Sequence, residues 1–206
     1  ATEISFFYAD GIGGQGRDLS TAFVQEVLTD IDKRHIGAEL GIEAQVTPTI
    51  KLKGAAAFGQ YTYDNNPDLM LTSDDFDEPI DLGKSYLKDY KIAGGPQQAY
   101  QIGFEYRDPD YWWVGATSNF FSNAYVDVSP ITRSSNFYSD FDGVPYNDYD
   151  PEVARGLLKQ EEFDSYMLVN VVGGKSWKVD DYFIGFFATI NNVFDQEYKP
   201  GGYEQG

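Results

Sequence analysis

The chain of 206 residues carries a formal net charge of −18, from 33 acidic residues against 15 lysines and arginines. Nucleic acid is therefore not expected as a partner, because phosphate contacts need a basic surface. Cysteine is absent, which excludes disulfides and thiolate metal sites. No apolar run reaches the roughly 18 residues of a membrane-spanning helix.

The first 32 residues predict a strand, a loop and a helix. With 16 tyrosines and 15 phenylalanines the composition favours β-structure, and residues 2–9 have the character of a short strand. The glycine-rich loop at 11–16 lacks the Lys-Ser/Thr of a phosphate cradle, so no nucleotide is expected there. Asp18 is expected to cap a helix with apolar residues at helical spacing, namely Leu19, Ala22, Phe23, Val27, Leu28 and Ile31.

The clearest pattern is a two-residue alternation over 33–46. Its apolar members are Ile36, Ala38, Leu40, Ile42, Ala44 and Val46. This run is longer than the common soluble strand of about 5–6 residues, and it suits a tilted strand with lipid on one side and water on the other. Further strands are predicted at 50–63, 97–107, 111–121, 164–173 and 182–190.

The connections alternate in length. Those at 10–32, 64–96 and 122–163 are long, and those at 47–49, 108–110 and 174–181 are short. Asp150 and Pro151 are expected to begin a helix near the end of the last long segment. The alternation predicts an all-β fold: a portion of an antiparallel transmembrane β-barrel with about seven strands, long external loops and short periplasmic turns. The aromatic group Tyr111, Trp112 and Trp113 would then lie in an interfacial girdle.

The stretch Asn191-Asn192-Val193-Phe194-Asp195, followed by Tyr198, resembles a signature near the C-terminus of TonB-dependent outer-membrane receptors. Segments 95–100, 103–107, 112–115 and 128–133 look like receptors of Bacteroidota that carry a carboxypeptidase-regulatory-like domain. The resemblance implies that residues 1–206 are a C-terminal segment of a 22-stranded barrel, without the plug, the energy-coupling box and the final strand.

The resemblance also implies a function and partners. The protein would lie in the outer membrane of a Gram-negative cell, among lipid and lipopolysaccharide. External loops would bind a ligand for uptake energised by the TonB coupling protein, which would act through the missing N-terminal part. A surface lipoprotein or a larger envelope complex could be a further partner. Two alternatives remain open: a barrel that is a binding or structural subunit of an envelope assembly, and a soluble β-sandwich lectin or hydrolase.

Candidate contact residues for a ligand or partner lie in the long segments. Arg133 could be a charged anchor, and the aromatics could offer flat apolar surfaces; they are Phe76, Tyr86, Tyr90, Phe137, Tyr138, Phe141, Tyr146 and Tyr149. The alternative is that these aromatics pack the loops against one another. Loop acids could hold Ca²⁺, which prefers oxygen ligands; the first group is Asp74, Asp75, Asp77 and Glu78 with Asp81, and the second is Asp140, Asp142, Asp148 and Asp150. Neither group has EF-hand spacing, and solvated loop charge is the alternative.

No catalytic set is predicted, and the chain is not expected to be an enzyme. Glu39 and Glu43 would lie about 13 Å apart on one strand, beyond the roughly 5–9.5 Å of a glycosidase pair. They are expected to be hydrated carboxylates, with Lys51 or Lys53 as neutralising neighbours. The single histidine, His35, has no second histidine with which to bind a metal.

Overall fold

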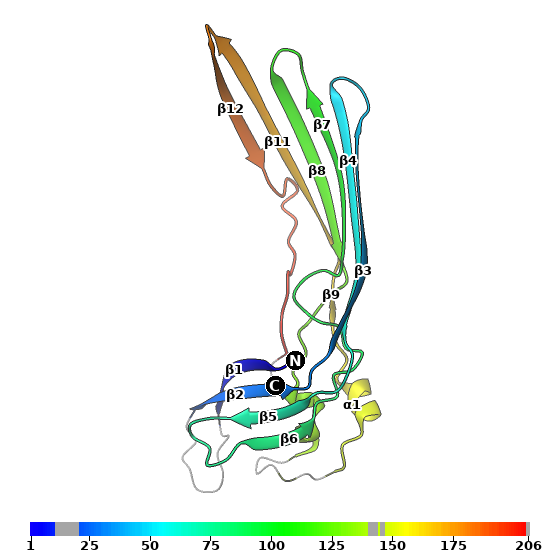
Figure 1. The fold of residues 1–206 in the computed structure, drawn as a ribbon, viewed down its shortest axis with the longest axis vertical. Helices are drawn as coiled ribbons and strands as arrows, with labels where there is room; N and C mark the ends of the chain where they lie inside the picture. The colour runs from blue at the N-terminus through cyan, green and yellow to red at the C-terminus, as the bar shows by residue number, and fades with distance from the viewer. Residues whose placement is uncertain (11–20, 140–143, 145–146, 205–206) are drawn as a thin grey trace.

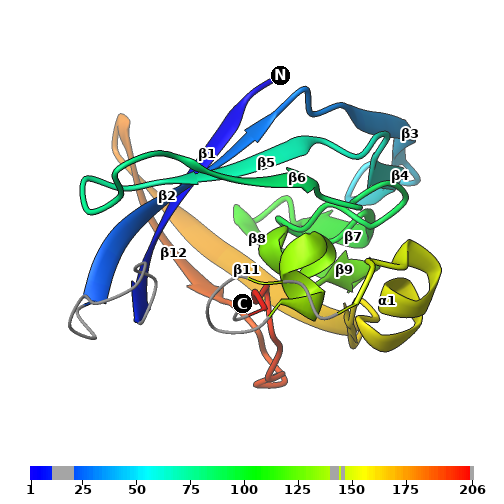
Figure 2. The same cartoon turned by 90° about the horizontal axis from the view of Figure 1, so that it is seen from below.

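The computed structural model describes residues 1–10, 21–139, 144 and 147–204. Its largest element is a six-stranded antiparallel sheet of long strands (Figure 1). In spatial order these are β12 (Tyr182–Ile190), β11 (Tyr166–Val179), β8 (Trp112–Ser122), β7 (Gln98–Arg107), β4 (Ile50–Tyr63) and β3 (Lys33–Gln45). Within the described residues no strand pairs with the outer edges of β3 and β12, and the long sheet forms an open arc (Figure 2). The prediction of antiparallel all-β structure is confirmed.

The connections of the long sheet differ in length at its two ends. The hairpins β3–β4, β7–β8 and β11–β12 turn tightly at one end, while the long connections and both termini lie at the other (Figure 1). Chain-adjacent long strands pair as antiparallel neighbours, so short and long connections must alternate between the two ends. The predicted alternation is confirmed.

A second, four-stranded sheet lies at the long-loop end and extends across the open side of the arc (Figure 2). Its order is β1 (Glu3–Asp10), β2 (Thr21–Thr29), β5 (Asp68–Thr72) and β6 (Ile80–Lys84). Short elements accompany it, namely β9 (Ala124–Tyr125), η1 (Ile131–Arg133), η2 (Ser135–Tyr138), α1 (Pro151–Leu157) and β10 (Glu162–Phe163). We call the described residues of 1–32, 64–97 and 123–165 the loop module.

The buried apolar core belongs to the loop module. Leu28, Leu69, Leu87 and Val128 pack in one cluster, together with Tyr63 at the end of β4. The helix prediction at Asp150 is confirmed, because its side chain accepts hydrogen bonds from the amides of Glu152 and Val153 at 2.9 and 3.1 Å. None of the helices in the described part of the chain has the length and apolar composition needed to cross a membrane.

Three local predictions are wrong. Residues 21–29 are strand β2 and not a helix; Val24, Glu26 and Leu28 are buried at two-residue spacing, while apolar residues on the other face produced the helical pattern. The strand at 2–9 exists as β1 but pairs with β2, so the long sheet has six strands and not seven. Asp18 and Leu19 lie outside the described residues.

The third error concerns the turn predicted at 174–181. Strand β11 continues to Val179, and the turn is confined to Asp180 and Asp181. Gly174 lies within the strand, and a Cβ on it would lie 2.8 Å from the indole nitrogen of Trp113. The glycine therefore makes room within the sheet for an aromatic side chain on the neighbouring strand.

Candidate functional site

One face of the long sheet is apolar across all six strands. The register places Ile42, Gly54, Ile102, Ser118 and Val169 in one row across β3, β4, β7, β8 and β11. Side chains two residues away in either direction share this face. It holds apolar and aromatic residues at two-residue spacing, namely Ile36, Ala38, Leu40, Ile42, Tyr100, Ile102, Phe104, Ile184 and Phe186, and a barrel would turn these side chains outward to the lipid. The face is open, since Leu40 is 70% exposed and Ile102 is 75% exposed.

Aromatic rings lie near both ends of this apolar face. Towards the short turns, Tyr106 and Trp112 have ring centroids 5.0 Å apart, while Tyr111 in the turn contacts Phe183, which has the register of the opposite face, at 5.4 Å. Towards the long loops, Tyr100 lies 5.2 Å from Phe58. Tyr100 and Tyr106 are six residues apart on β7, which corresponds to about 20 Å along the strand. Two rows of rings therefore border the apolar band, although Trp113 of the predicted girdle points to the opposite face.

The opposite face carries the ion pairs of the sheet. Glu43 pairs with Lys51 at 2.8 Å and with Lys53 at 3.9 Å, and Lys53 reaches Glu105 at 3.4 Å. The expected pairing with Lys51 and Lys53 is confirmed for Glu43, but no ion pair of the described residues involves Glu39. On this face β3 and β7 carry mainly polar residues and glycine, whereas β4 and β8 mix polar residues with small and aromatic ones. Strands β11 and β12 add apolar residues, among them Leu168, Val172 and Phe187.

Charged side chains avoid the apolar face except at its margins. Among the charged residues of the six long strands, only Arg34 and Lys175 occupy positions of the apolar face. Each lies near a strand end, and its side chain turns to a polar partner. Arg34 pairs with Asp64 at 3.3 Å, and the Lys175 amino group donates to the Asp110 carbonyl. The long sheet and its turns contain seven acids and seven bases, so the whole formal charge of −18 belongs to the rest of the chain.

The motif Asn191–Asp195 forms the corner that ends β12. Asn192 has a positive φ of 49°, a conformation that asparagine tolerates better than most residues. Its side-chain amide donates to the Gln196 carbonyl at 3.1 Å, and its Oδ1 accepts from the Gln196 amide at 2.9 Å. The Val193 amide donates to the Val169 carbonyl at 2.8 Å, while the Val193 and Phe194 side chains are exposed. Tyr198 stacks on Tyr166 with centroids 4.3 Å apart.

Four predicted contact residues form one aromatic group in the loop module. Tyr149 stacks on Tyr86 at 4.9 Å and lies 5.8 Å from Tyr138, which contacts Phe137 at 4.8 Å. Burial raises the pKa of Tyr149 to about 12. Tyr86 and Tyr149 also line a shallow hollow of about 380 Å³, together with Asp81, Lys84 and Ser135. Phe76 packs separately, against the buried pair Val24 and Leu71. Phe141 and Tyr146 lie outside the described residues.

The predicted anchors Arg133 and Tyr90 are internal. Arg133 is 1% exposed and Tyr90 is 5% exposed, and the guanidinium lies over the Tyr90 ring at 4.6 Å. Both nitrogens of the fork bind the Glu204 carboxylate, Nη1 at 2.5 Å and Nη2 at 2.9 Å. The side chain that looked most suitable for an external ligand is therefore occupied within the fold.

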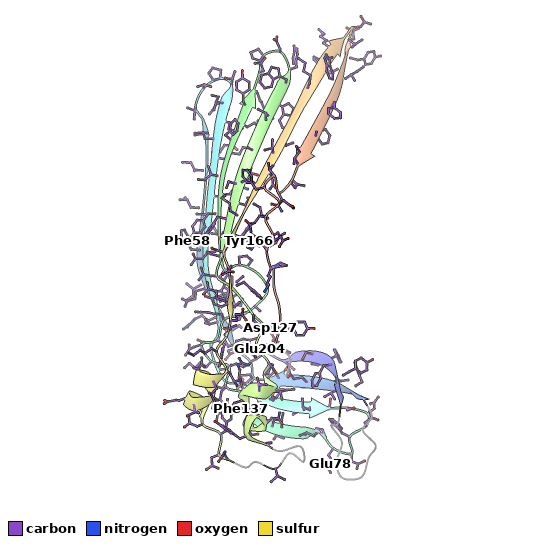
Figure 3. The ribbon with its side chains drawn as sticks, turned by 180° about the vertical axis from the view of Figure 1, so that it is seen from behind. Phe58, Glu78, Asp127, Phe137, Tyr166 and Glu204 are labelled. Atoms are coloured by element: carbon purple, nitrogen blue, oxygen red, sulfur yellow. The ribbon has the colours of Figure 1, made fainter. Side chains whose placement is uncertain are left out.

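The loop acids form no recognisable metal centre. Among the residues that the structure describes, no group of three or more His, Cys, Asp or Glu side chains is arranged to hold a metal ion. Asp74, Asp75, Asp77 and Glu78 lie in the β5–β6 connection, with Glu78 at the end of the module remote from the long sheet (Figure 3). In the second group Asp150 caps α1, and Asp140 and Asp142 lie outside the described residues. A Ca²⁺ site stays a prediction.

Two carboxyl groups with raised pKa values, the buried Glu26 and the more exposed Asp127, escaped the sequence analysis. Glu26 on β2 is 7% exposed and accepts a hydrogen bond from the Ser5 hydroxyl at 3.0 Å. Burial raises the pKa of Glu26, and the nearby charge of Asp127 raises it further; partial desolvation also raises the pKa of Asp127 itself, although that residue is exposed. The alternation of Glu26 with Val24 and Leu28 could have signalled an inward position, had the segment been recognised as a strand.

No family model matches this chain, and no curated protein matches it. The resemblance to TonB-dependent receptors therefore stays a prediction from the sequence segments that carry it.

Proposed function

We propose that residues 1–206 belong to the β-barrel of an outer-membrane receptor of the TonB-dependent type, in which the loop module lies outside the cell and binds the ligand to be taken up. One observation carries the proposal. Six antiparallel strands of 9–14 residues present an apolar face without interior charges, and the ion pairs lie on the other face. A bilayer is the environment in which such a face is stable.

Two further features support the membrane placement. Outer-membrane barrels have short turns on the periplasmic side, long loops outside, and aromatic girdles at both interfaces; the long sheet has the corresponding turns, loops and rings. An apolar surface of this extent in water would favour aggregation. Energised uptake rests on the family resemblance, which implies a plug and a coupling segment in the N-terminal part of such receptors.

The soluble β-sandwich alternative requires the apolar faces of two sheets to pack on each other. Within the described residues the small sheet lies at the end of the long strands, and Leu40, Ile102 and Phe186 stay open to the surroundings. The geometry therefore favours the membrane proposal over a sandwich lectin or hydrolase.

Single cysteines test the placement, because the chain has none of its own. A nitroxide would be attached to Leu40→Cys or Ile102→Cys, with Glu39→Cys and Gln101→Cys as neighbours on the opposite face. In the full chain reconstituted into lipid, the first two labels should collide with oxygen, which partitions into lipid, and be shielded from a water-soluble nickel chelate. Labels at Leu40 and Ile102 that the chelate reaches freely, or that neither reagent reaches, would refute the proposal.

A second candidate function is a barrel that serves as a binding subunit of an envelope assembly. It is favoured by an apolar strip on the outer face of the β1–β2 hairpin, where Ile4, Phe6, Tyr8 and Phe23 are all exposed and Phe6 stacks on Phe23 at 5.6 Å. A surface lipoprotein or another envelope subunit would cover this strip. A photo-crosslinking residue at Tyr8 should then yield a defined adduct in cells, and the same residue at Lys199 should not.

A further inference from the structure

The segment after β12 spans the distance between the long sheet and the loop module. We call residues 193–204 the strap (Figure 1). All residues from 193 to 203 are exposed, and the strap has no ladder beyond a single parallel bridge between Asp127 and Tyr203. It is therefore held at few points, and the chemistry of those points decides whether it stays in place.

The points of attachment lie at the start, middle and end of the strap. At the start the Val193 amide binds the Val169 carbonyl, and in the middle Tyr198 stacks on Tyr166. At the end the Asp127 amide donates to the Gly202 carbonyl at 2.8 Å, and the Glu204 amide donates to the Asp127 carbonyl at 2.9 Å. Asp127 and Glu204 lie side by side where the long sheet meets the module (Figure 3).

The strongest attachment is the bidentate pair of Glu204 with Arg133. The Arg133 guanidinium also donates to the carbonyls of Ser129 and Leu158, at 3.1 and 3.3 Å, and covers the Tyr90 ring. The Tyr90 hydroxyl in turn donates to the Leu158 carbonyl at 3.0 Å. One buried cation thus joins three parts of the module to the strap.

Glu204 is the only carboxylate paired with Arg133 in the described part of the chain. The Nε of Arg133 is buried and has no partner there, so its remaining donors depend on the strap, on two carbonyls and on the Thr132 hydroxyl. Without Glu204 the guanidinium would be buried without a counter-ion, a state that proteins avoid by opening or rearranging. The position of the strap and the order of the module are therefore coupled through one side-chain pair.

We propose that the strap is a conformational latch. With Glu204 seated on Arg133, the segments that carry Tyr90 and Leu158 are held together; with the strap released, these segments loosen. Because the strap begins at the corner that ends β12, a displacement of the β11–β12 hairpin would pull on Glu204 and so alter the module. This coupling does not depend on the membrane placement proposed above, since every contact in it lies at the long-loop end.

Hydrogen exchange in the full chain, purified in detergent, tests the latch. The variant Arg133→Met/Glu204→Met removes the pair without leaving a buried charge. The amide of Glu204 reports on the strap, and those of Tyr86 and Leu158 report on the module, because they bind the carbonyls of Arg133 and Ala154 at 2.7 Å. We expect all three amides to exchange at least about tenfold faster, with the β3–β4 hairpin unchanged.

A crosslink distinguishes the latch from a simpler explanation, in which the module loosens only because the internal contacts of Arg133 are lost. The chain contains no cysteine, so Asp127→Cys and Tyr203→Cys, added to the same variant, can form a disulfide between partners of the parallel bridge. Oxidation should restore slow exchange at Tyr86 and Leu158, and reduction should abolish it. Wild-type exchange at these two amides in the uncrosslinked variant, or fast exchange that oxidation does not reverse, would overturn the proposal. If the double variant fails to fold, Glu204→Gln serves with the same readouts, and Glu197→Gln on the exposed strap is its control.

Discussion

A single charge placed on the apolar face provides the strongest test of its environment. Leu40 lies near the middle of β3, seven residues from Lys33 and five from Gln45. At about 3.3 Å per residue and a tilt of about 40°, it would lie roughly 13–18 Å from each membrane surface, close to the midplane. Arginine at the midplane of an outer-membrane barrel costs about 2–4 kcal/mol, so Leu40→Arg should lower the folding equilibrium constant by about 30- to 700-fold.

The neighbouring Glu39 supplies the matched control. It lies on the opposite face of the same strand, so Glu39→Arg introduces the same side chain into a hydrated setting. We expect it to cost much less than Leu40→Arg in urea titrations of the full chain folded into lipid vesicles. Equal losses for the two variants would refute the assignment of the faces, and so would a greater loss for Glu39→Arg.

Three further predictions concern the loop module and the corner after β12. Glu204→Ala should cost about 2–4 kcal/mol in chemical unfolding, since it strands the buried Arg133, whereas Lys84→Ala in an exposed ion pair should cost less than about 1 kcal/mol. Burial raises the folded pKa of Glu26, so its stabilising contribution is present below the unfolded pKa and is lost as the pH rises through the raised value. Glu26→Gln should therefore raise the melting temperature at neutral pH and flatten its pH dependence, and an unchanged pH profile would contradict this. Asn192→Ala should lower the free energy of unfolding by about 1–3 kcal/mol, because two hydrogen bonds are lost and alanine disfavours the positive φ at this position. Backbone amides in the corner that follows β12 should then exchange with solvent faster, and unchanged exchange there would contradict the prediction.

Period-two alternation made the long sheet predictable, because a strand with distinct environments on its two faces must alternate. The strands at 33–46 and 50–63 were located within a residue or so, and the connection lengths placed the turns and loops at opposite ends. The loop module was less predictable. Its strand β2 presents Val24 and Leu28 to the core and Phe23 to the outside, so the apolar residues do not identify one face, and only pairing with β1 and β5 decides the structure.

The candidate site was predictable in its composition but not in its contacts. The sequence identifies the aromatic loop residues, and four of them, Tyr86, Phe137, Tyr138 and Tyr149, do form one group. It could not show that Arg133 is buried, because its partner Glu204 lies 71 residues away and beyond two long strands. An arginine in a long loop has the same local signature whether its fork binds an external ligand or a distant segment of its own chain.

The distribution of charge links the two parts of the molecule. Seven acids and seven bases cancel within the long sheet, and the apolar face excludes charge except at its margins. An ionised group in hydrocarbon is costly, so a chain that spans a bilayer has to carry any excess charge outside it. Here the entire excess of −18 lies outside the long sheet and its turns, and most of it belongs to the loop module. Such a surface repels anions and concentrates cations. The module is thus expected to bind a cationic or neutral ligand, or an anionic one only with a bridging divalent ion, and association with a cationic ligand should slow as the ionic strength rises.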